Sequence, residues 1–374
     1  MLINKVIIFP INRPLGTNCD YALQTIRLLS IRNQVIVLDF SSHLTLKNLI
    51  GNYIRRKNKL THFPAQLKKI TIFSFICLIP FIRSKAIYNL NLNLFLFAHC
   101  VYQYLKHQAN LLIWLQHPQF AHVSLVPYFT IFYDCLDYYL EEFPKNEILL
   151  TKKTTFMVTN SHILKKTHAK FRKKITVVPQ GFRIETFRDI KPVVGQKIIG
   201  YFGGLNYRAD FKLLQILIST NPQWQFIFVG EITKHRLDIQ YDSPNKWHNL
   251  SLYPNVIIKK AVRPNQVPTL MAQIAIGIIP YDKKQNFNRY CYPMKLMEYF
   301  YMGKPVISTP IEELKRFPKY VKIGSSSKQW QNHIHSLLKK PWPMPIQYQQ
   351  RQLAINNNWM HKIEAIGRIL NANR

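Results

Sequence analysis

The sequence predicts an α/β protein built from two Rossmann-like domains, each a parallel sheet covered by helices. Three observations support this class. The length of 374 residues exceeds what one core usually organises. Apolar runs of strand length alternate with stretches of helix length, as in sheets that are buried on both faces. The same alternation restarts after Gly181, so the second half has the architecture of the first.

In the first half, the helix-length stretches include Asp20 to Ile31 and Arg83 to Gln108. We expect residues 1–180 to form the N-terminal domain. Its predicted strands are KVIIF, QVIVLDF, KITIFSF, LLIWLQH, YFTIFYD, TTFMVTNS and KITVVPQG. Their nearly continuous apolar character is typical of buried parallel strands.

In the second half, residues 181–196 have the composition of a connection. We expect residues 181–350 to form the C-terminal domain and residues 351–374 a helix that returns to the N-terminal domain. The predicted strands are KIIGYFGG, WQFIFVGE, NVIIKKAV, IAIGIIPY and KPVISTP. Ligands of such folds bind beyond the carboxyl ends of the strands, so a central cleft between two facing sheets is the expected site.

The charge balance is strongly basic. The chain has 51 Lys and Arg against 18 Asp and Glu, a formal charge of +33 and a pI near 10.0. Such a surface suits an anionic partner: nucleic acid, an acidic membrane face or a phosphorylated substrate. A compositional bias is the alternative explanation. No basic cluster is interleaved with a nucleic-acid-reading motif.

Cysteine usage and apolar runs bear on the compartment. The cysteines are odd in number and widely spread, which supports neither a disulfide framework nor a metal site and favours a reducing cytosol. The apolar run from Ile70 to Ile82 is shorter than the roughly 20 residues of a membrane span. We interpret it as a buried strand that leads into a loop, with an interfacial anchor as the alternative. The N-terminal apolar run is too short for a signal peptide.

Four segments carry a family resemblance. In chain order they are KIIGYFGGLNYRADFKLLQIL, WQFIFVGE, PNVIIKKAVRPNQVPTLMAQIAIGIIPYD and YPMKLMEYFYMGKPVISTP. They resemble the donor-binding half of a GT-B glycosyltransferase of the retaining family 4 type (glycosyl transferases group 1). The resemblance is most specific over residues 151–314. It implies a nucleotide-diphosphate sugar as donor, retention at the anomeric carbon, no cofactor and no metal.

Two glycines follow the first strand of the second half. Gly203 and Gly204 let backbone N–H groups approach a phosphate, although a tight turn alone also explains such a pair. The resemblance implies that this loop faces the donor diphosphate. The family commonly has Arg directly after its glycine, where this chain has Leu205. We therefore expect Arg208 and Lys295 to contact the phosphates.

Glu298 lies in a short aromatic helix that begins near Pro293 and is closed by Gly303. It shares a face with Lys295, and a local ion pair is the simplest reading of that spacing. A carboxylate at this place can also accept hydrogen bonds from the vicinal hydroxyls of a ribose. Glu298 matches the second Glu of the family's paired-Glu motif, which the resemblance gives this role.

The first Glu of that motif is replaced by Tyr290. This departure leaves the identity of the sugar open and makes an inactive homologue an alternative. Asp282 can supply a substitute acid at the donor site, or it is a solvated loop residue. Farther along, Thr309 and Glu312 have the spacing of a helix capping box, for which a structural role suffices.

In the first half, candidate residues follow predicted strands. Arg13 and Gly16 lie in the loop where the family receives its acceptor. His117 follows a strand and precedes a proline, and the resemblance places a His that touches the donor sugar in this region. Asp134 and Asp137 can each orient an acceptor hydroxyl or cap a helix, and we favour Asp137. His117 and Asp137 are the catalytic candidates.

We therefore expect a cytoplasmic glycosyltransferase that transfers hexose-like sugars to a cell-envelope or polysaccharide acceptor. Its basic surface suits peripheral docking on the inner, anionic face of the membrane. The alternatives are an inactive GT-B subunit that binds a glycan or partner, and a nucleic-acid-binding protein. The donor base, sugar, acceptor, linkage and oligomeric state do not follow from the sequence.

Overall fold

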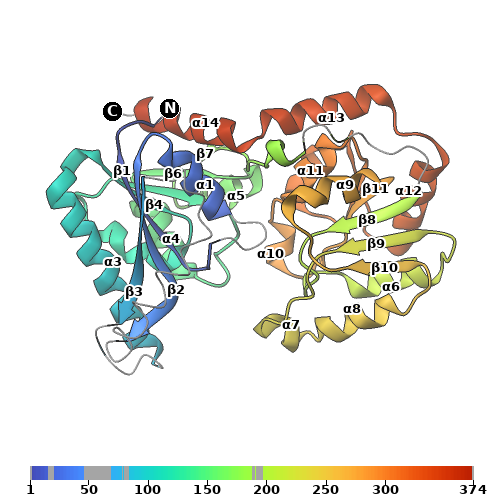
Figure 1. The fold of residues 1–374 in the computed structure, drawn as a ribbon, viewed down its shortest axis with the longest axis horizontal. Coiled ribbons are helices and arrows are strands. Elements are labelled where there is room, and N and C mark those ends of the chain that lie inside the picture. Colours follow the sequence, from blue (N-terminus) through green and yellow to red (C-terminus); the bar gives the residue numbers. More distant parts are fainter. Residues whose placement is uncertain are drawn as a thin grey trace. The chain divides into compact units, whose positions relative to one another are not determined.

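The structure is a computed structural model that describes residues 2–15, 21–45, 69–77, 79, 84–187, 190 and 197–372. The chain divides into two compact units (Figure 1). The first comprises Met1–Pro179 together with Trp359–Arg374, and the second comprises Gln180–Asn358. Each unit has its own parallel sheet and its own apolar core.

The first unit contains a seven-stranded parallel sheet in the order β3-β2-β1-β4-β5-β6-β7. Its central strands are buried throughout, which explains their continuous apolar sequence. The strands are β1 (Val6–Ile11), β2 (Gln34–Thr45), β3 (Ile70–Cys77), β4 (Leu111–Leu115), β5 (Ile131–Cys135), β6 (Phe156–Thr159) and β7 (Thr176–Val177). Ile70–Cys77 is thus a strand, as predicted, but it is not buried throughout, because it lies at the edge of the sheet and only Phe75 and Cys77 are buried.

Helices cover this sheet. They are α1 (Tyr21–Ser30), α3 (Lys85–His107), α4 (Pro144–Lys153), α5 (His162–His168) and α14 (Trp359–Ala372), with short 3-10 turns η3 (Gln108–Asn110) and η4 (Pro118–Leu125). The helix α14 comes from the end of the chain and packs on α1. A buried ion pair fixes it there, because Lys362 Nζ lies 3.0 Å from Asp134 Oδ1 at the end of β5.

The second unit contains a six-stranded parallel sheet in the order β10-β9-β8-β11-β12-β13. The strands are β8 (Ile198–Phe202), β9 (Gln225–Val229), β10 (Val256–Lys259), β11 (Ile276–Ile279), β12 (Val306–Ser308) and β13 (Val321–Ile323). All predicted strands of this half are therefore present. Large aromatic side chains, among them Trp247, Trp330 and Tyr299, fill the core.

The helices of this unit are α6 (Phe211–Ser219), α7 (Arg236–Gln240), α8 (Ser243–Ser251), α9 (Val267–Ala272), α10 (Asn286–Arg289), α11 (Lys295–Tyr301), α12 (Ser327–Lys339) and α13 (Met344–Asn356), with 3-10 turns η5 (Ile184–Thr186), η6 (Pro264–Gln266) and η7 (Glu312–Arg316). None of the helices in the described parts of the chain is both long and apolar enough to cross a membrane.

The strand order reverses direction at one place in each sheet. In the first unit β1 lies between β2 and β4, and in the second β8 lies between β9 and β11. Loops on opposite sides of the sheet diverge at such a point and leave a crevice beyond the carboxyl ends of the strands. The loops after β1, β4, β8 and β11 are therefore where ligand-binding side chains are expected.

Candidate functional site

The loop after β8 is held tightly against its neighbour β9. Gly203 has φ +137°, a backbone conformation that favours glycine. Its N–H donates to the Val229 carbonyl at 3.0 Å, and the Leu205 N–H donates to the Glu231 carbonyl at 2.8 Å. A Cβ on Gly230 would overlap the Gly203 carbonyl, so this approach also depends on glycine. The next residue, Gly204, is exposed at the surface of the loop.

The Lys295 ammonium lies directly beside this loop. A Cβ added to Gly203 would stand 3.0 Å from Lys295 Nζ. The buried Nζ donates to the Tyr281 hydroxyl at 2.6 Å and lies 4.3 Å from the centre of the Tyr201 ring. Burial alone would lower the pKa of Lys295, but the surrounding tyrosine oxygens outweigh it and the pKa is raised. Lys295 therefore remains a cation at the Gly203 loop.

Arg208 brings a second cation to the same tyrosine. Its guanidinium lies 4.2 Å from the centre of the Tyr281 ring and 4.7 Å from that of Phe287. Arg208 Nε also donates to Asn288 Oδ1 at 2.6 Å. Burial would raise the pKa of Tyr281, yet the charges of Lys295 and Arg208 prevail and lower it. The loops after β8 and β11 thus share a concentrated positive charge, which suits a diphosphate.

Asn288 organises the loop after β11 and was not anticipated from the sequence. It is fully buried, and its amide nitrogen donates to the backbone carbonyls of Arg208 at 3.2 Å and Asp282 at 3.0 Å. Tyr281 was missed as well. Tyr281 could have been found from the sequence, because it directly follows a strand next to the place where the strand order reverses. Asn288 lies within α10, and that position offers no such signal.

The Glu298 carboxylate has no hydrogen-bond or ion-pair partner among the described residues. Its side chain is partly buried in α11. Burial raises the pKa of Glu298 from 4.5 to about 7, with the charge of Lys295 opposing the shift. The local ion pair considered for this spacing does not form, because the Lys295 ammonium is bonded to Tyr281. Glu298 is therefore an acceptor without a partner among the described residues, one helical turn from the Lys295 cation.

The α11 helix has the expected limits. It spans Lys295–Tyr301 after Pro293, and Gly303 adopts φ +65° at its end. The predicted capping box of Thr309 and Glu312 is wrong. The Thr309 hydroxyl donates to the Tyr281 carbonyl at 2.7 Å, and Glu312 pairs with Arg289 and Lys315.

The two residues that raised doubts in the sequence, Asp282 and Tyr290, lie before and after α10. Asp282 Oδ1 accepts a hydrogen bond from the Lys284 N–H at 2.9 Å, so part of its carboxylate stabilises a turn. Tyr290 follows α10, and the Arg289 guanidinium lies 5.6 Å from the centre of its ring. A donor-binding role of Asp282 stays a prediction.

In the first unit, His117 follows β4 and caps η4. His117 Nδ1 accepts from the Gln119 N–H at 3.2 Å, so the ring proton resides on Nε2. The ring packs edge-on against Tyr139 and Phe143. Burial, together with the charge of Arg13, lowers the pKa of His117 to about 4. His117 is thus a neutral imidazole whose Nε2–H can donate to a ligand oxygen.

The other candidates of this unit separate into distinct environments. Asp134 is fully buried and accepts from Lys362 and from Gln116 Nε2, both at 3.0 Å, so it holds the fold together. Asp137 is partly exposed and Arg13 is exposed. The structure thus places His117 and Arg13 close enough to interact, after neighbouring strands. Gly16 lies outside the described residues.

A second polar cluster lies behind β5. Donor atoms of Cys135, Glu147 and His168 come within 4.8 Å of one another, and all three residues are buried. The Glu147 carboxylate accepts from Tyr133 Oη and pairs with His168 Nε2, each at 2.6 Å. His168 Nδ1 lies 2.8 Å from the Leu164 carbonyl. These bonds pair the buried groups with one another and account for the cluster as a structural network.

Comparison with known proteins finds similarity to glycosyltransferases over part of the chain. Residues 196–339 match the family model described as glycosyl transferases group 1. A putative teichuronic acid biosynthesis glycosyltransferase of Bacillus subtilis (strain 168) is 26% identical over 235 residues, which are 55% of this chain. The match spans 57% of that relative, little more than half its length.

Solved structures share the fold over nearly the whole chain. Sucrose-phosphate synthase from Thermosynechococcus elongatus superposes with a TM-score of 0.75 at 13% identity, covering 99% of both chains. The Anabaena protein HepE in complex with UDP and glucose has a TM-score of 0.69 at 14% identity, covering 99% of this chain and all of the other. With its two parallel-sheet units, the chain has the predicted GT-B fold.

Proposed function

We propose that this chain, a GT-B protein with a group 1 glycosyl transferase region at residues 196–339, is a glycosyltransferase. It would move a hexose-like sugar from a nucleotide-diphosphate donor to a polysaccharide or cell-envelope acceptor. One observation carries the proposal: two cations, Lys295 and Arg208, converge on Tyr281 beside the Gly203 loop. Glu298, whose carboxylate has no partner among the residues that the structure describes, lies one helical turn from Lys295.

These groups match the parts of a nucleotide sugar. Lys295, Arg208 and the N–H group of Gly204 stabilise the diphosphate, because charge grows there as the glycosidic bond breaks. Glu298 accepts hydrogen bonds from the ribose hydroxyls. Such bonds favour the ionised carboxylate, so the raised pKa of the free protein should fall when the donor binds. Asp282 is the further donor-site candidate.

We assign the reaction to the retaining class. The bond between the anomeric carbon and the diphosphate oxygen breaks, and the acceptor oxygen bonds to the same face of that carbon. The acceptor proton passes to the departing diphosphate. The neutral His117 Nε2–H donates to a sugar oxygen, Asp137 orients the acceptor hydroxyl, and Arg13 and Gly16 contact the acceptor. The fixed cations supply the charge stabilisation that a metal supplies elsewhere, so we expect activity to persist in EDTA.

The acceptor is an anionic or lipid-linked glycan at the inner face of the membrane, which would place the chain in the cytoplasm as a peripheral protein. The name of the Bacillus subtilis relative refers to teichuronic acid biosynthesis, and the formal charge of +33 suits an anionic glycan or membrane.

Calorimetry against a panel of UDP-, GDP-, ADP- and TDP-sugars tests the donor site. We expect the wild type to bind nucleotide sugars of one base. The variants Glu298→Gln and Arg208→Met should abolish that binding. Glu185→Gln, which changes an exposed carboxylate of the same unit, is the matched control. Absence of binding by the wild type to any nucleotide sugar would overturn the proposal.

An inactive GT-B subunit is the second candidate, and the observation that favours it is Tyr290 in place of the first motif Glu. Donor binding without transfer or donor hydrolysis, across a panel of glycan acceptors, would favour this alternative. Retention on DNA without nucleotide-sugar binding would instead favour a nucleic-acid-binding protein.

A further inference from the structure

The long helix α3 carries a second apolar stripe on its outer face. Its inner face is buried against β1, β3 and β4. On the outer face, Leu90, Leu94, Phe97 and Leu105 are 48%, 44%, 47% and 74% exposed. The spacing between these residues matches helical turns, so they line up on one side. No Asp, Glu, Lys or Arg occurs between Lys85 and Lys106.

The stripe continues onto the neighbouring segment. Leu125, at the end of η4, is 57% exposed, and Tyr128 is 75% exposed. The adjoining Phe129 is buried, and its ring lies 6.3 Å from that of Phe97 and 5.6 Å from that of Tyr104. The outer stripe and residues 125–128 thus form one apolar face, which we call the α3 face. Scattered apolar residues are common on protein surfaces, but an ordered face of this kind marks an interaction site.

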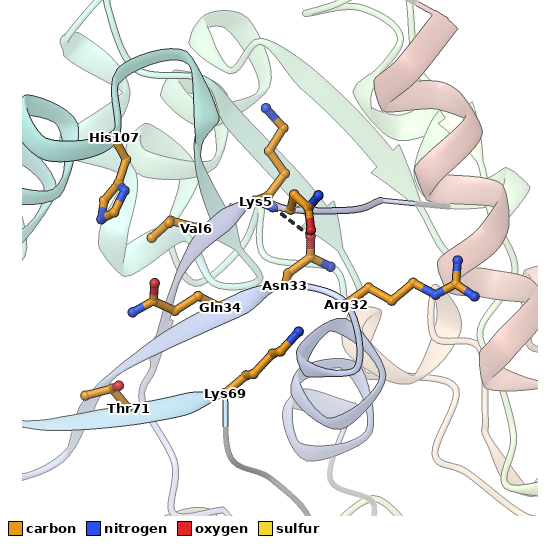
Figure 2. A pocket seen from close by; sticks show the side chains of 9 residues that line it. Lys5, Val6, Arg32, Asn33, Gln34, Lys69, Thr71 and His107 are labelled. Atoms are coloured by element: carbon orange, nitrogen blue, oxygen red, sulfur yellow. Dashed lines mark hydrogen bonds between the residues drawn. The ribbon is translucent and has the colours of Figure 1, made fainter.

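A basic recess of about 500 Å³ lies at the C-terminal end of α3. It is lined by the amino-terminal ends of β1, β2 and β3 and by His107, the last residue of α3. Figure 2 shows Arg32 and Lys69 both next to Asn33, with His107 farther away, beyond Val6 and Gln34. Ile3 and Ile31, next to lining residues in the chain, are 49% and 56% exposed. Cations and exposed apolar side chains therefore occur together here as well.

The charge of the chain selects among possible occupants of the α3 face. A second copy would bring another formal charge of +33 to a face bordered by Lys85, Lys106 and the recess. Repulsion opposes such a pairing. An anionic lipid surface matches both parts, because apolar side chains enter the acyl boundary while Lys and Arg meet the headgroups.

We propose that the α3 face and the basic recess dock this chain on an anionic lipid surface, with α3 lying in the plane of the interface. The docking deepens the proposed function and rests on it for its purpose, because it would hold the enzyme at a membrane-linked acceptor. The amino-terminal edge of the sheet, rather than the His117 loops at the opposite edge, carries the recess.

Vesicle sedimentation with the full chain tests the proposal. We expect binding to phosphatidylcholine vesicles that contain phosphatidylglycerol to exceed binding to phosphatidylcholine alone about tenfold or more. Raising the salt to about 1 M, where the Debye length is about 3 Å, should remove most of that difference. Binding that is equal on both vesicles, or absent from both, would overturn the proposal.

Two sets of variants locate the surface. The triple variant Leu94→Ser, Phe97→Ser, Leu105→Ser should lower vesicle binding about tenfold or more, and its control is Leu252→Ser, Tyr348→Ser in the second unit. The double variant Arg32→Glu, Lys69→Glu should lower vesicle binding roughly tenfold. The control for this variant is Lys165→Glu, Lys166→Glu on α5. Controls that weaken binding as much as the test variants would overturn the assignment to this face.

Sedimentation equilibrium tests whether a second copy of the chain, rather than a lipid surface, occupies the α3 face. A wild-type dimer that the triple variant abolishes would assign the α3 face to a second copy and overturn the proposal. Vesicle binding is measured without nucleotide, and nucleotide-sugar binding without vesicles. Failure of the docking surface is thereby separate from failure of the proposed function.

Discussion

The Glu298→Gln substitution is predicted to stabilise the free protein while it abolishes donor binding. Burial raises the pKa of Glu298 from 4.5 to about 7. In the unfolded chain this carboxyl ionises at its ordinary pKa, so between these two values the native state binds more protons than the unfolded state. Stability is therefore lost as the pH rises from about 4.5 to about 7, and the loss is complete above that range.

The magnitude follows from the size of the shift. At 1.36 kcal/mol per pKa unit, a rise from 4.5 to about 7 corresponds to about 3 kcal/mol. The side chain is partly exposed, and solvent screening reduces this to about 2 kcal/mol. Glutamine has nearly the same shape and cannot ionise. At pH 8 we therefore expect Glu298→Gln to unfold at higher urea concentration than the wild type, and at pH 4.5 to unfold with it.

The assay is urea unfolding of wild type, Glu298→Gln and the control Glu185→Gln at both pH values. Calorimetry at pH 6.5 provides the second measurement, in buffers of different ionisation enthalpy. Donor binding should release protons from the wild type, because hydrogen bonds from the ribose lower the pKa of Glu298. A stability difference that is the same at both pH values, or donor binding unchanged by Glu298→Gln, would refute the reasoning.

Three further predictions follow from single contacts. Gly203→Ala should lower the free energy of unfolding by about 1–3 kcal/mol and weaken donor binding, since the φ of Gly203 is +137° and an added Cβ would press on Lys295. Urea unfolding and calorimetry measure the two effects, and an equal effect of Gly204→Ala would contradict the prediction. Lys362→Met should lower the free energy of unfolding by about 3–5 kcal/mol because it leaves Asp134 buried and unpaired. The loss should largely disappear when Lys362→Met is combined with Asp134→Asn. A double variant as unstable as Lys362→Met alone would contradict the role of the ion pair. The His117 ring should stay neutral down to about pH 5 by NMR titration, with stability falling as the pH drops from 6.5 toward 4; titration near 6.5 would show that burial and Arg13 do not act on it.

Sequence reasoning predicted the features that local chemistry encodes. The parallel strands follow from continuous apolar runs, because buried strands need apolar side chains on both faces. The helix that carries Glu298 follows from Pro293 before it and Gly303 after it, and the structure confirms both limits. Gly203 and Gly204 were predicted to let backbone N–H groups approach a phosphate or to form a tight turn, and Gly203 has a φ of +137°, which favours glycine.

The sequence could not determine which partner each polar side chain takes. Lys295 and Glu298 have the spacing of a helical ion pair, but Tyr281 lies closer to the ammonium in the folded chain and Glu298 is left open. Thr309 has the spacing of a helix cap, but the Tyr281 carbonyl takes its hydroxyl. In both cases a contact between distant parts of the chain replaces the local one.

Asp134 and Asp137 show the same division in the first unit. Asp134 lies near the end of β5 and Asp137 follows the strand, and the sequence favoured Asp137 for function without a structural reason. Only the packing of α14 from the far end of the chain buries Asp134 and gives it Lys362, while Asp137 stays partly exposed. The pattern of apolar residues, the glycines and prolines at turns and helix ends, and the composition thus determined the architecture from the sequence alone. Tertiary contacts decided which ionisable groups are paired and which remain open to a ligand, because burial and partners depend on residues that are distant in the chain.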